Sequence, residues 1–339
     1  MGKKRIFQTA LICLLLAFFL SLGGCFNVGP RPENAVVFVD REVERAVCGA
    51  LRKPRGYVTE EDLLGVTRII LSHCTVSSFE DLRGCVNLTE LHVWESTCTV
   101  SDLSPLAKLE KLKILLVQTS EVDDLSPLAG LKNLTELEMN YANISDISPL
   151  ADLTELEFLS LCDSSVKDFS LITEMSHLTG LVLEANNIRD ISFLSDMDNL
   201  EILSLNNNPI ENLYYLSGLK NLKSLHLSYC GIQDISDLSP LIKLESLELE
   251  DNNIDDIRPI ENLTALWMLD LSKNNISDIS PIENCTEMGL LYVSENPIAD
   301  VTPITKLKNL MVLHISIKKN GKEHKLLKEA LPGCHIDTW

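Results

Sequence analysis

The stretch LDLSKNNISDISPIENCTEMGL, residues 269–290, decides the fold of this chain. Leu269 and Leu271 alternate with a polar residue, which is typical of a short strand with one buried face. Ser280 and Pro281 place a capping residue before a proline, and this pattern favours the start of a helical turn. The stretch therefore predicts a strand, a turn and a short helical segment, which needs neighbours to bury its apolar side.

The rest of the chain supplies those neighbours, because pairs of aliphatic residues recur in the same register. From Leu115 to Leu313 each pair follows the last by 22 residues, and the step from Leu91 to Leu115 is 24. A fixed period of this length indicates a solenoid, in which each coil buries its apolar face against the next. The twelve predicted strands carry pairs that begin at Ile69, Leu91, Leu115, Leu137, Leu159, Leu181, Leu203, Leu225, Leu247, Leu269, Leu291 and Leu313.

Two polar positions share this period. The third residue after a pair is often asparagine, and we expect its amide to bond buried backbone groups of the adjacent coil. The residues of this predicted ladder are Asn186, Asn208, Asn252, Asn274 and Asn296. Aspartate recurs before the helical segment, where it is expected to cap the local turn. Calcium binding is the alternative, but these carboxylates spread along a line instead of converging on one point, so no metal site is predicted.

Composition excludes several classes of function. The formal net charge is −20, whereas nucleic-acid binding needs a basic face. The ten cysteines contain no CxxC pair, so a zinc site is not supported. No P-loop, GxGxxG or HExxH motif is present, and no nucleophile can be assigned beside a base. We therefore predict a protein that is not an enzyme, needs no cofactor and is a monomer.

The N-terminal segment has the features of an export signal. Basic residues 3–5 precede the apolar run of residues 6–22, which Gly23, Gly24 and Cys25 follow. This ending resembles the lipobox of bacterial lipoproteins, and the resemblance implies cleavage before Cys25 and lipidation of its thiol. An uncleaved anchor is the alternative. The predicted location is the outward-facing side of a bacterial cell membrane, with residues 1–24 as signal peptide and 25–35 as lipidated tether.

The repeat resembles the 22-residue leucine-rich repeat of internalins. Residues 36–66 contain an amphipathic helix pattern and a capping box at Thr59 and Asp62, which resembles the helical N-terminal cap of that family. The array of about twelve coils occupies residues 67–317, and residues 318–339 resemble a C-terminal cap. The resemblance implies an α/β solenoid with a parallel sheet on its concave face, short 3-10 or helical segments on its convex face, and a protein ligand.

The predicted binding surface consists of positions around each leucine pair, which the repeat leaves free. The aromatic side chains expected there are residue types common in binding hot spots. The candidate ligand-binding residues are His92, Trp94, Tyr141, Phe158, His226, Tyr229, Glu248, Glu250, Asp251, Asp270 and Tyr292. We predict that they bind a protein or peptide. A cell-wall polymer ligand and a structural, envelope-organising role are the alternatives.

The sequence leaves two points open: the role of the acidic residues on this surface and the state of some of the cysteines. Glu248, Glu250, Asp251 and Asp270 predict a dock for a basic segment, and a solvated acidic face or a calcium site is the alternative. Cysteines at repeat core positions are predicted to be reduced and buried. They are Cys74, Cys85, Cys230 and Cys285. The pairing of Cys48, Cys98 and Cys334 is not predicted.

Overall fold

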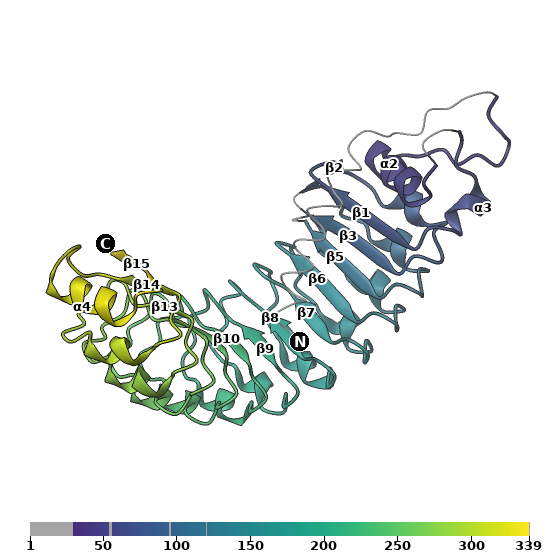
Figure 1. Ribbon diagram of the computed structural model, residues 1–339. Helices are drawn as coiled ribbons and strands as arrows, with labels where there is room; N and C mark the ends of the chain where they lie inside the picture. The colour runs from purple at the N-terminus through teal and green to yellow at the C-terminus, as the bar shows by residue number, and fades with distance from the viewer. Residues whose placement is uncertain (1–29, 54–55, 95, 120, 339) are drawn as a thin grey trace. The chain divides into compact units, whose positions relative to one another are not determined.

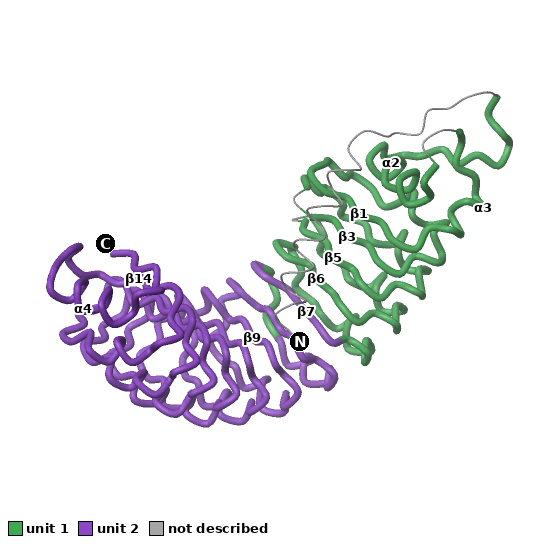
Figure 2. Tube along the Cα trace, in the orientation of Figure 1, with its two compact units in different colours: residues 1–156, 164–168 green, residues 157–163, 169–339 purple. Residues whose placement is uncertain are grey.

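The computed structural model describes residues 30–53, 56–94, 96–119 and 121–338. Cys25, the predicted lipidation site, lies outside these residues. The chain divides into two compact units (Figure 2). Unit 1 contains residues up to 156 together with 164–168, and unit 2 contains residues 157–163 and those from 169 onward.

Unit 1 begins with the two short helices that the sequence predicts. Helix α2 (Arg41–Ala50) starts at Asp40, whose side chain accepts hydrogen bonds from Glu42 N and Val43 N. Helix α3 (Glu60–Leu63) carries a complete capping box between Thr59 and Asp62. Such bonds satisfy the free N–H groups of a first helical turn. Val43 and Val47 of α2 are fully buried, so the helix covers the apolar end of the first coil.

The strands of unit 1 follow the predicted pairs. They are β1 (Arg68–Ser72), β3 (Glu90–Trp94), β5 (Ile114–Gln118) and β6 (Glu136–Asn140). All are parallel, and Ile69, Leu91, Leu115 and Leu137 are register partners in that order. Two further strands of two residues each, β2 (Thr75–Val76) and β4 (Thr97–Cys98), pair beside them. The turns back to the sheet are the 3-10 segments η1 (Glu80–Leu82), η2 (Ser104–Leu106), η3 (Ser126–Leu128) and η4 (Ser148–Leu150).

Unit 2 repeats the same coil. Its strands are parallel and in chain order: β7 (Phe158–Ser160), β8 (Gly180–Val182), β9 (Ile202–Ser204), β10 (Ser224–His226), β11 (Ser246–Glu248), β12 (Met268–Asp270), β13 (Leu290–Tyr292), β14 (Val312–Ile315) and β15 (His335–Thr338). Each register partner from β7 to β14 lies 22 residues away. In Figure 1 the strands line the inner side of this curved unit, and the 3-10 segments lie outside. This is a leucine-rich-repeat solenoid.

The outer segments of unit 2 are η5 (Ser170–Glu174), η6 (Ser192–Leu194), η7 (Tyr214–Gly218), η8 (Ser236–Leu238), η9 (Arg258–Ile260), η10 (Ser280–Asn284), η11 (Thr302–Lys306) and helix α4 (Lys322–Ala330). The predicted aspartate caps precede most of them. Asp278 Oδ1, for example, accepts from Ser280 N at 2.8 Å. Equivalent bonds are made by Asp102, Asp124, Asp146, Asp190, Asp234, Asp256 and Asp300. These carboxylates thus bond their own turns.

Leucines fill the space between sheet and outer segments. Leu269 and Leu271, from the stretch that opened the sequence, are fully buried, as are their equivalents in neighbouring coils. Burying one such side chain contributes roughly 1.5–3 kcal/mol. No helix among the described residues is long and apolar enough to cross a membrane.

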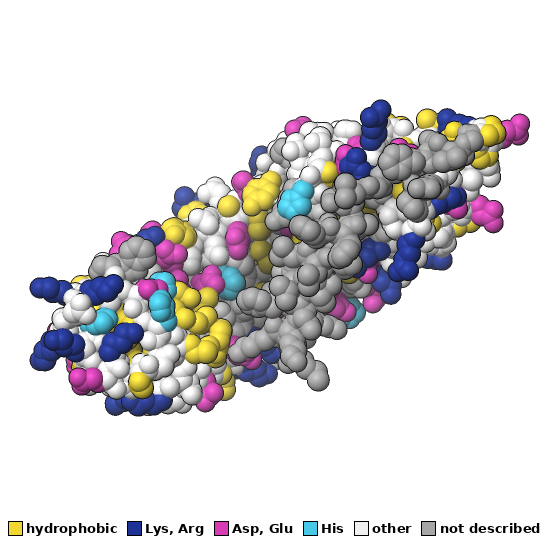
Figure 3. Space-filling view, turned by 45° about the horizontal axis from the view of Figure 1, so that its top comes forward, with side chains coloured by type: hydrophobic (Ala, Val, Ile, Leu, Met, Phe, Trp, Pro, Cys, Tyr) yellow, Lys and Arg dark blue, Asp and Glu magenta, His cyan; other side chains and the backbone are white. Residues whose placement is uncertain are grey.

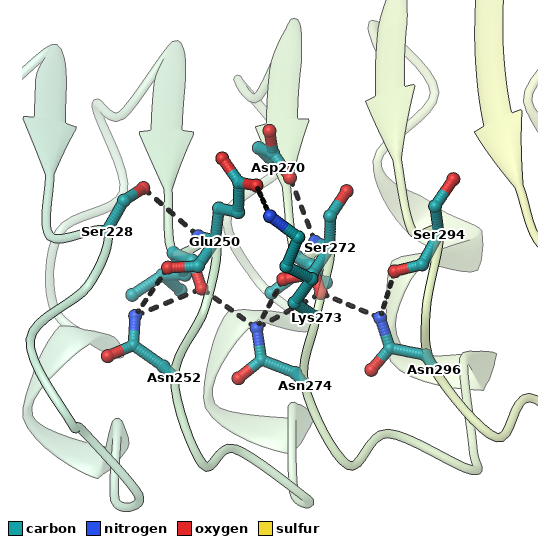
Figure 4. Close-up of polar contacts among 11 residues, drawn as sticks. Ser228, Glu250, Asn252, Asp270, Ser272, Lys273, Asn274, Ser294 and Asn296 are labelled. Atoms are coloured by element: carbon teal, nitrogen blue, oxygen red, sulfur yellow. Dashed lines mark hydrogen bonds and ion pairs between the residues drawn. The ribbon is translucent and has the colours of Figure 1, made fainter.

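Asparagine side chains form a ladder along unit 2 (Figure 4), which is buried except at Asn296, where the side chain is partly exposed. Asn208 is 0% exposed; its Oδ1 accepts from Asn186 N and Ile188 N, and its Nδ2 donates to Leu183 O and Leu205 O. Asn252, Asn274 and Asn296 make the equivalent bonds to the preceding coil. Each amide therefore satisfies backbone groups of two coils.

A second, outer set of asparagines was not predicted. In each, the amide donates to a backbone carbonyl of the preceding coil, as when Asn221 Nδ2 donates to Asp198 O at 2.7 Å. Each of these residues directly precedes a buried leucine, and that leucine lies two residues before the start of the next strand. The asparagines are partly or fully exposed. The set is Asn87, Asn133, Asn199, Asn221 and Asn309.

The cysteine predictions are confirmed in three of four positions. Cys85, Cys230 and Cys285 are free and buried, and burial raises their pKa values to about 12, 11 and 11 respectively. The prediction of burial is wrong for Cys74, which is free but half-exposed. It occupies the ladder position of the first coil, where its thiol lies 3.6 Å from Ser96 Oγ. Cys98 and Cys334 are also free.

Candidate functional site

The outward face of the unit 2 sheet carries three rows of side chains, because strand residues alternate between core and solvent. The entry row precedes the first leucine of each pair, the central row lies between the two leucines, and the exit row follows the second. The entry row is Phe158, Gly180, Ile202, Ser224, Ser246, Met268, Leu290 and Val312. The central row is Ser160, Val182, Ser204, His226, Glu248, Asp270, Tyr292 and His314.

A fourth row lies at the rim, where the chain turns after each strand. Its residues all have positive φ, a left-handed conformation that is uncommon for residues other than glycine. They include Tyr141 of unit 1, and Asp163, Ala185, Asn207, Tyr229, Asp251, Lys273 and Glu295 of unit 2. Tyr141, Tyr229 and Asp251, which were predicted on the strand face, therefore lie just past the ends of the strands, and their role in binding stays a prediction. The backbone has already turned, which leaves Tyr141 57% and Tyr229 44% exposed at the rim.

The four acidic residues predicted as one patch have different surroundings. Glu250 is paired with Lys273, whose Nζ lies 2.8 Å from its carboxylate (Figure 4). Asp251 is exposed in the turn. Glu248 and Asp270 are register partners on β11 and β12 and are only half-exposed. The patch thus separates into a neutralised pair, a solvated residue and two adjacent carboxylates, which we call the acidic pair.

No Lys or Arg among the described residues forms an ion pair with the acidic pair. The basic group next to Glu248 is His226, whose Nδ1 lies 3.6 Å from the carboxylate, and Asp270 accepts a hydrogen bond from Ser272 N. Burial raises the pKa of Glu248, opposed by His226 and reinforced by the charge of Asp270. Burial likewise raises the pKa of Asp270, opposed by the Ser272 hydrogen bonds. Both carboxylates are thus poorly compensated when charged.

Histidine and tyrosine continue the central row toward the end of the sheet. Tyr292 and His314 are register partners on β13 and β14, with ring centroids 4.8 Å apart. His314 Nε2 lies 3.1 Å from Asp337 of β15, and the other carboxylate oxygen of Asp337 is 3.1 Å from His335 Nε2. Among the residues that the structure describes, no three His, Cys, Asp or Glu side chains are placed to hold a metal ion.

The five predicted aromatic residues do not gather in one place within either unit. Trp94 and Tyr141 belong to unit 1, whereas Phe158, Tyr229 and Tyr292 are spread over unit 2 from β7 to β13. Each has its own setting: the ring of Phe158 lies over Gly180, where a Cβ would be 2.4 Å from it. Lys273 Nζ lies 5.7 Å from the ring centroid of Tyr229.

His92 was predicted to face outward, and its register agrees with this direction, but the side chain is buried. By register it shares a face with Ile70 and Leu116, but it is only 7% exposed. It packs edge-on against Trp94, at 6.4 Å between ring centroids, and its Nε2 lies 3.3 Å from Glu90. Burial, together with the charge of Arg68, lowers its pKa. His92 therefore behaves as a packed residue of unit 1.

Sequence reasoning missed an apolar cluster beside the acidic pair. It consists of Trp267, Met268, Leu290, Met311 and Val312. The position of Trp267 carries Glu, Thr or Lys in the five preceding coils, so a comparison of equivalent solvent positions would have found it. Figure 3 shows hydrophobic side chains next to acidic and histidine side chains on the unit 2 side of the molecule. The cluster lies on β12 to β14 and the residues just before them.

Comparisons with known proteins agree with this architecture. The family model for leucine-rich repeats (two copies) matches residues 198–240 and 220–265. The crystal structure of the internalin InlF of Listeria monocytogenes is 30% identical, with 91% of each chain covered and a TM-score of 0.78. The chain therefore belongs to the internalin-like family of leucine-rich-repeat proteins.

More distant structures share the fold. A leucine-rich-repeat protein of Leptospira interrogans is 22% identical, with 77% of this chain and 75% of that chain covered and a TM-score of 0.60. The ectodomain of the receptor kinase GASSHO1/SCHENGEN3 of Arabidopsis thaliana, solved in complex with CASPARIAN STRIP INTEGRITY FACTOR 2, is 18% identical over 82% of this chain and 39% of that one, with a TM-score of 0.57. No curated protein matches the sequence. Leucine-rich-repeat proteins of this kind are binding scaffolds that mediate protein–protein interactions.

Proposed function

We propose that this protein binds a protein or peptide partner through the outward face of its repeat sheet, and that it does so outside the cytoplasm, anchored to a bacterial membrane by lipid on Cys25. The observation that carries the binding proposal is the acidic pair beside the apolar cluster. The buried leucines and the ladder asparagines join the coils from the other face of the sheet.

The complex of GASSHO1/SCHENGEN3 is consistent with this use of the fold, although its likeness to this chain extends to the fold alone. A wall-polymer ligand would favour neighbouring aromatic platforms, whereas Phe158, Tyr229 and Tyr292 lie several strands apart. The proposed division into signal peptide, tether, caps and array is the one derived from the sequence, and the proposed state is a monomer.

Site-specific photo-crosslinking on the native cell surface tests the binding proposal. A photoreactive residue at Leu290, on the sheet face, is expected to capture a partner protein. The same residue at Ile242, which is 61% exposed and lies away from the strands, is the matched control and is expected not to capture it. Equal capture from both positions, or none from Leu290, contradicts the proposal.

Lipidation is tested separately by feeding cells an alkyne analogue of palmitate. The wild-type chain is expected to incorporate the label and to fractionate with the membrane. The Cys25→Ala variant is expected to lose both properties, while Cys74→Ala, which removes another accessible thiol, retains them. Labelling of Cys25→Ala at the wild-type level would reject the anchor.

A further inference from the structure

The apolar cluster forms a continuous strip on one part of the unit 2 face. Met268, Leu290 and Val312 are register partners on β12, β13 and β14, so their side chains lie side by side across about 10 Å of sheet. Met311 is 50% exposed. The equivalent residues of the two preceding coils are Ser224 and Ser246, so the strip begins where two polar positions of the entry row end.

Trp267 extends this strip, and a glycine makes its position possible. The indole lies against Gly289 of the next coil, where a Cβ would be 2.5 Å from the indole Nε1. Any larger residue at position 289 would have to displace the ring. The indole therefore covers backbone of the neighbouring coil, directly before the strands that carry Met268 and Leu290.

The acidic pair gives this apolar strip an electrostatic preference. Glu248 and Asp270 are direct register partners, and adjacent strands are about 4.8 Å apart, so two like charges are held close together. The contrast is Glu250, one row away, which has Lys273 as its partner at 2.8 Å. Among the described residues, the basic groups that act on the acidic pair are imidazoles: His226 beside Glu248, and His314, whose charge acts on Asp270. A cation supplied from outside would complete this site.

The two features adjoin on a single strand. Asp270 lies two residues after Met268 on β12, a separation of about 7 Å along the strand. An extended peptide places its own residues i and i+2 at the same spacing and on the same side. We propose that this face takes an extended segment with a Lys or Arg side chain at the acidic pair and large apolar side chains, two residues away, on the strip of Trp267, Met268, Leu290 and Val312. This inference rests on the proposed function and specifies the chemistry of its partner.

Selection from a random decapeptide library displayed on phage, with the full-length protein as bait, tests the inference. The enriched peptides are expected to carry Lys or Arg within two residues of Leu, Ile, Phe, Met or Trp. The Glu248→Gln/Asp270→Asn variant is expected to reduce binding of these peptides at least tenfold. The control Asp198→Asn/Glu287→Gln removes the same number of charges from exposed positions off the sheet strands, and wild-type binding is expected.

Every result of the peptide selection either supports or overturns the inference. Enrichment of acidic or uncharged peptides, equal binding to wild type and to the acidic-pair variant, or no enrichment at all overturns the inference. Thermal unfolding of both variants checks that they are folded. The proposed function fails separately: capture of a partner from Leu290 together with any of those results leaves the binding face in place and rejects only its chemistry.

Discussion

The buried asparagine ladder and the central row occupy the same coils of unit 2 but have opposite properties. Asn252 and Asn274 find partners for their amides within the protein, coil after coil. Glu248 and Asp270 stand in an equally regular register and lack a Lys or Arg partner among the described residues. Regular spacing alone therefore does not reveal a residue's role. The difference lies in whether its polar groups are satisfied inside the solenoid.

The largest expected effect is the loss of stability when an asparagine of the buried ladder is replaced. Asn208→Ala removes acceptor and donor groups that serve five backbone groups in two coils. Leaving buried groups unpaired should lower the free energy of unfolding by about 3 kcal/mol. Asn221→Ala, from the outer set, is the matched control and should cost less than about 1 kcal/mol, since water replaces its bond. Urea denaturation measures both, and equal losses would show that burial does not distinguish the two sets.

The second effect is on binding. Glu248→Lys/Asp270→Lys reverses both charges of the acidic pair, and a cationic partner should bind about 10- to 100-fold more weakly. The salt dependence of binding should weaken or change sign, because repulsion replaces the attraction that salt screens in the wild type. Titrations at low and high salt measure this. If the affinity and its salt dependence stayed at their wild-type values, the central row would not be a charged contact.

The N-terminal cap of unit 1 contains a carboxylate, that of Asp40, whose hydrogen bonds are made within the protein. Asp40 is buried, which raises its pKa, but hydrogen bonds from Ser77, Glu42 and Val43 outweigh this and lower the pKa overall. Asp40→Ala should destabilise unit 1 by about 1.5 kcal/mol. Because the folded pKa lies below the unfolded value of about 3.9, this contribution is present above that pH and is lost as the pH falls through the folded pKa. Urea denaturation from pH 7 to pH 3 measures it, and a loss that does not shrink at low pH would exclude the carboxylate as its source.

The acidic pair should have the opposite effect on the pH dependence of stability. Its pKa values are raised in the folded state, so its ionisation lowers stability as the pH rises through them. Glu248→Gln/Asp270→Asn should therefore leave stability unchanged or increase it by about 0.5 kcal/mol at pH 7. The gain should shrink as the pH falls through the folded pKa values and disappear below the unfolded values of about 3.9 and 4.3, where both states are protonated. Melting temperatures at pH 7 and pH 4 give the comparison, and a clear loss of stability at pH 7 would mean that the charges serve the fold.

Much of the fold follows from the sequence, because the leucine pairs, the ladder asparagines and the Thr59 capping box are local patterns with one physical solution each. The site follows less completely. Strand alternation predicts the direction of Asp270 but fails at Tyr229, where the backbone has entered a left-handed turn. His92 is buried although its register places it on the outward face, and spacing does not specify how its neighbours pack over it. The indole of Trp267 needs Gly289, a residue of the next coil.

One titration tests the central claim most directly: the affinity of folded Glu248→Gln/Asp270→Asn protein for the partner captured from Leu290, with its free energy of unfolding measured on the same sample. We predict binding at least tenfold weaker than wild type and stability that is not reduced, because the acidic pair serves the partner and the ladder serves the coils. Wild-type affinity, or a loss of affinity matched by a loss of stability, would contradict this division of roles.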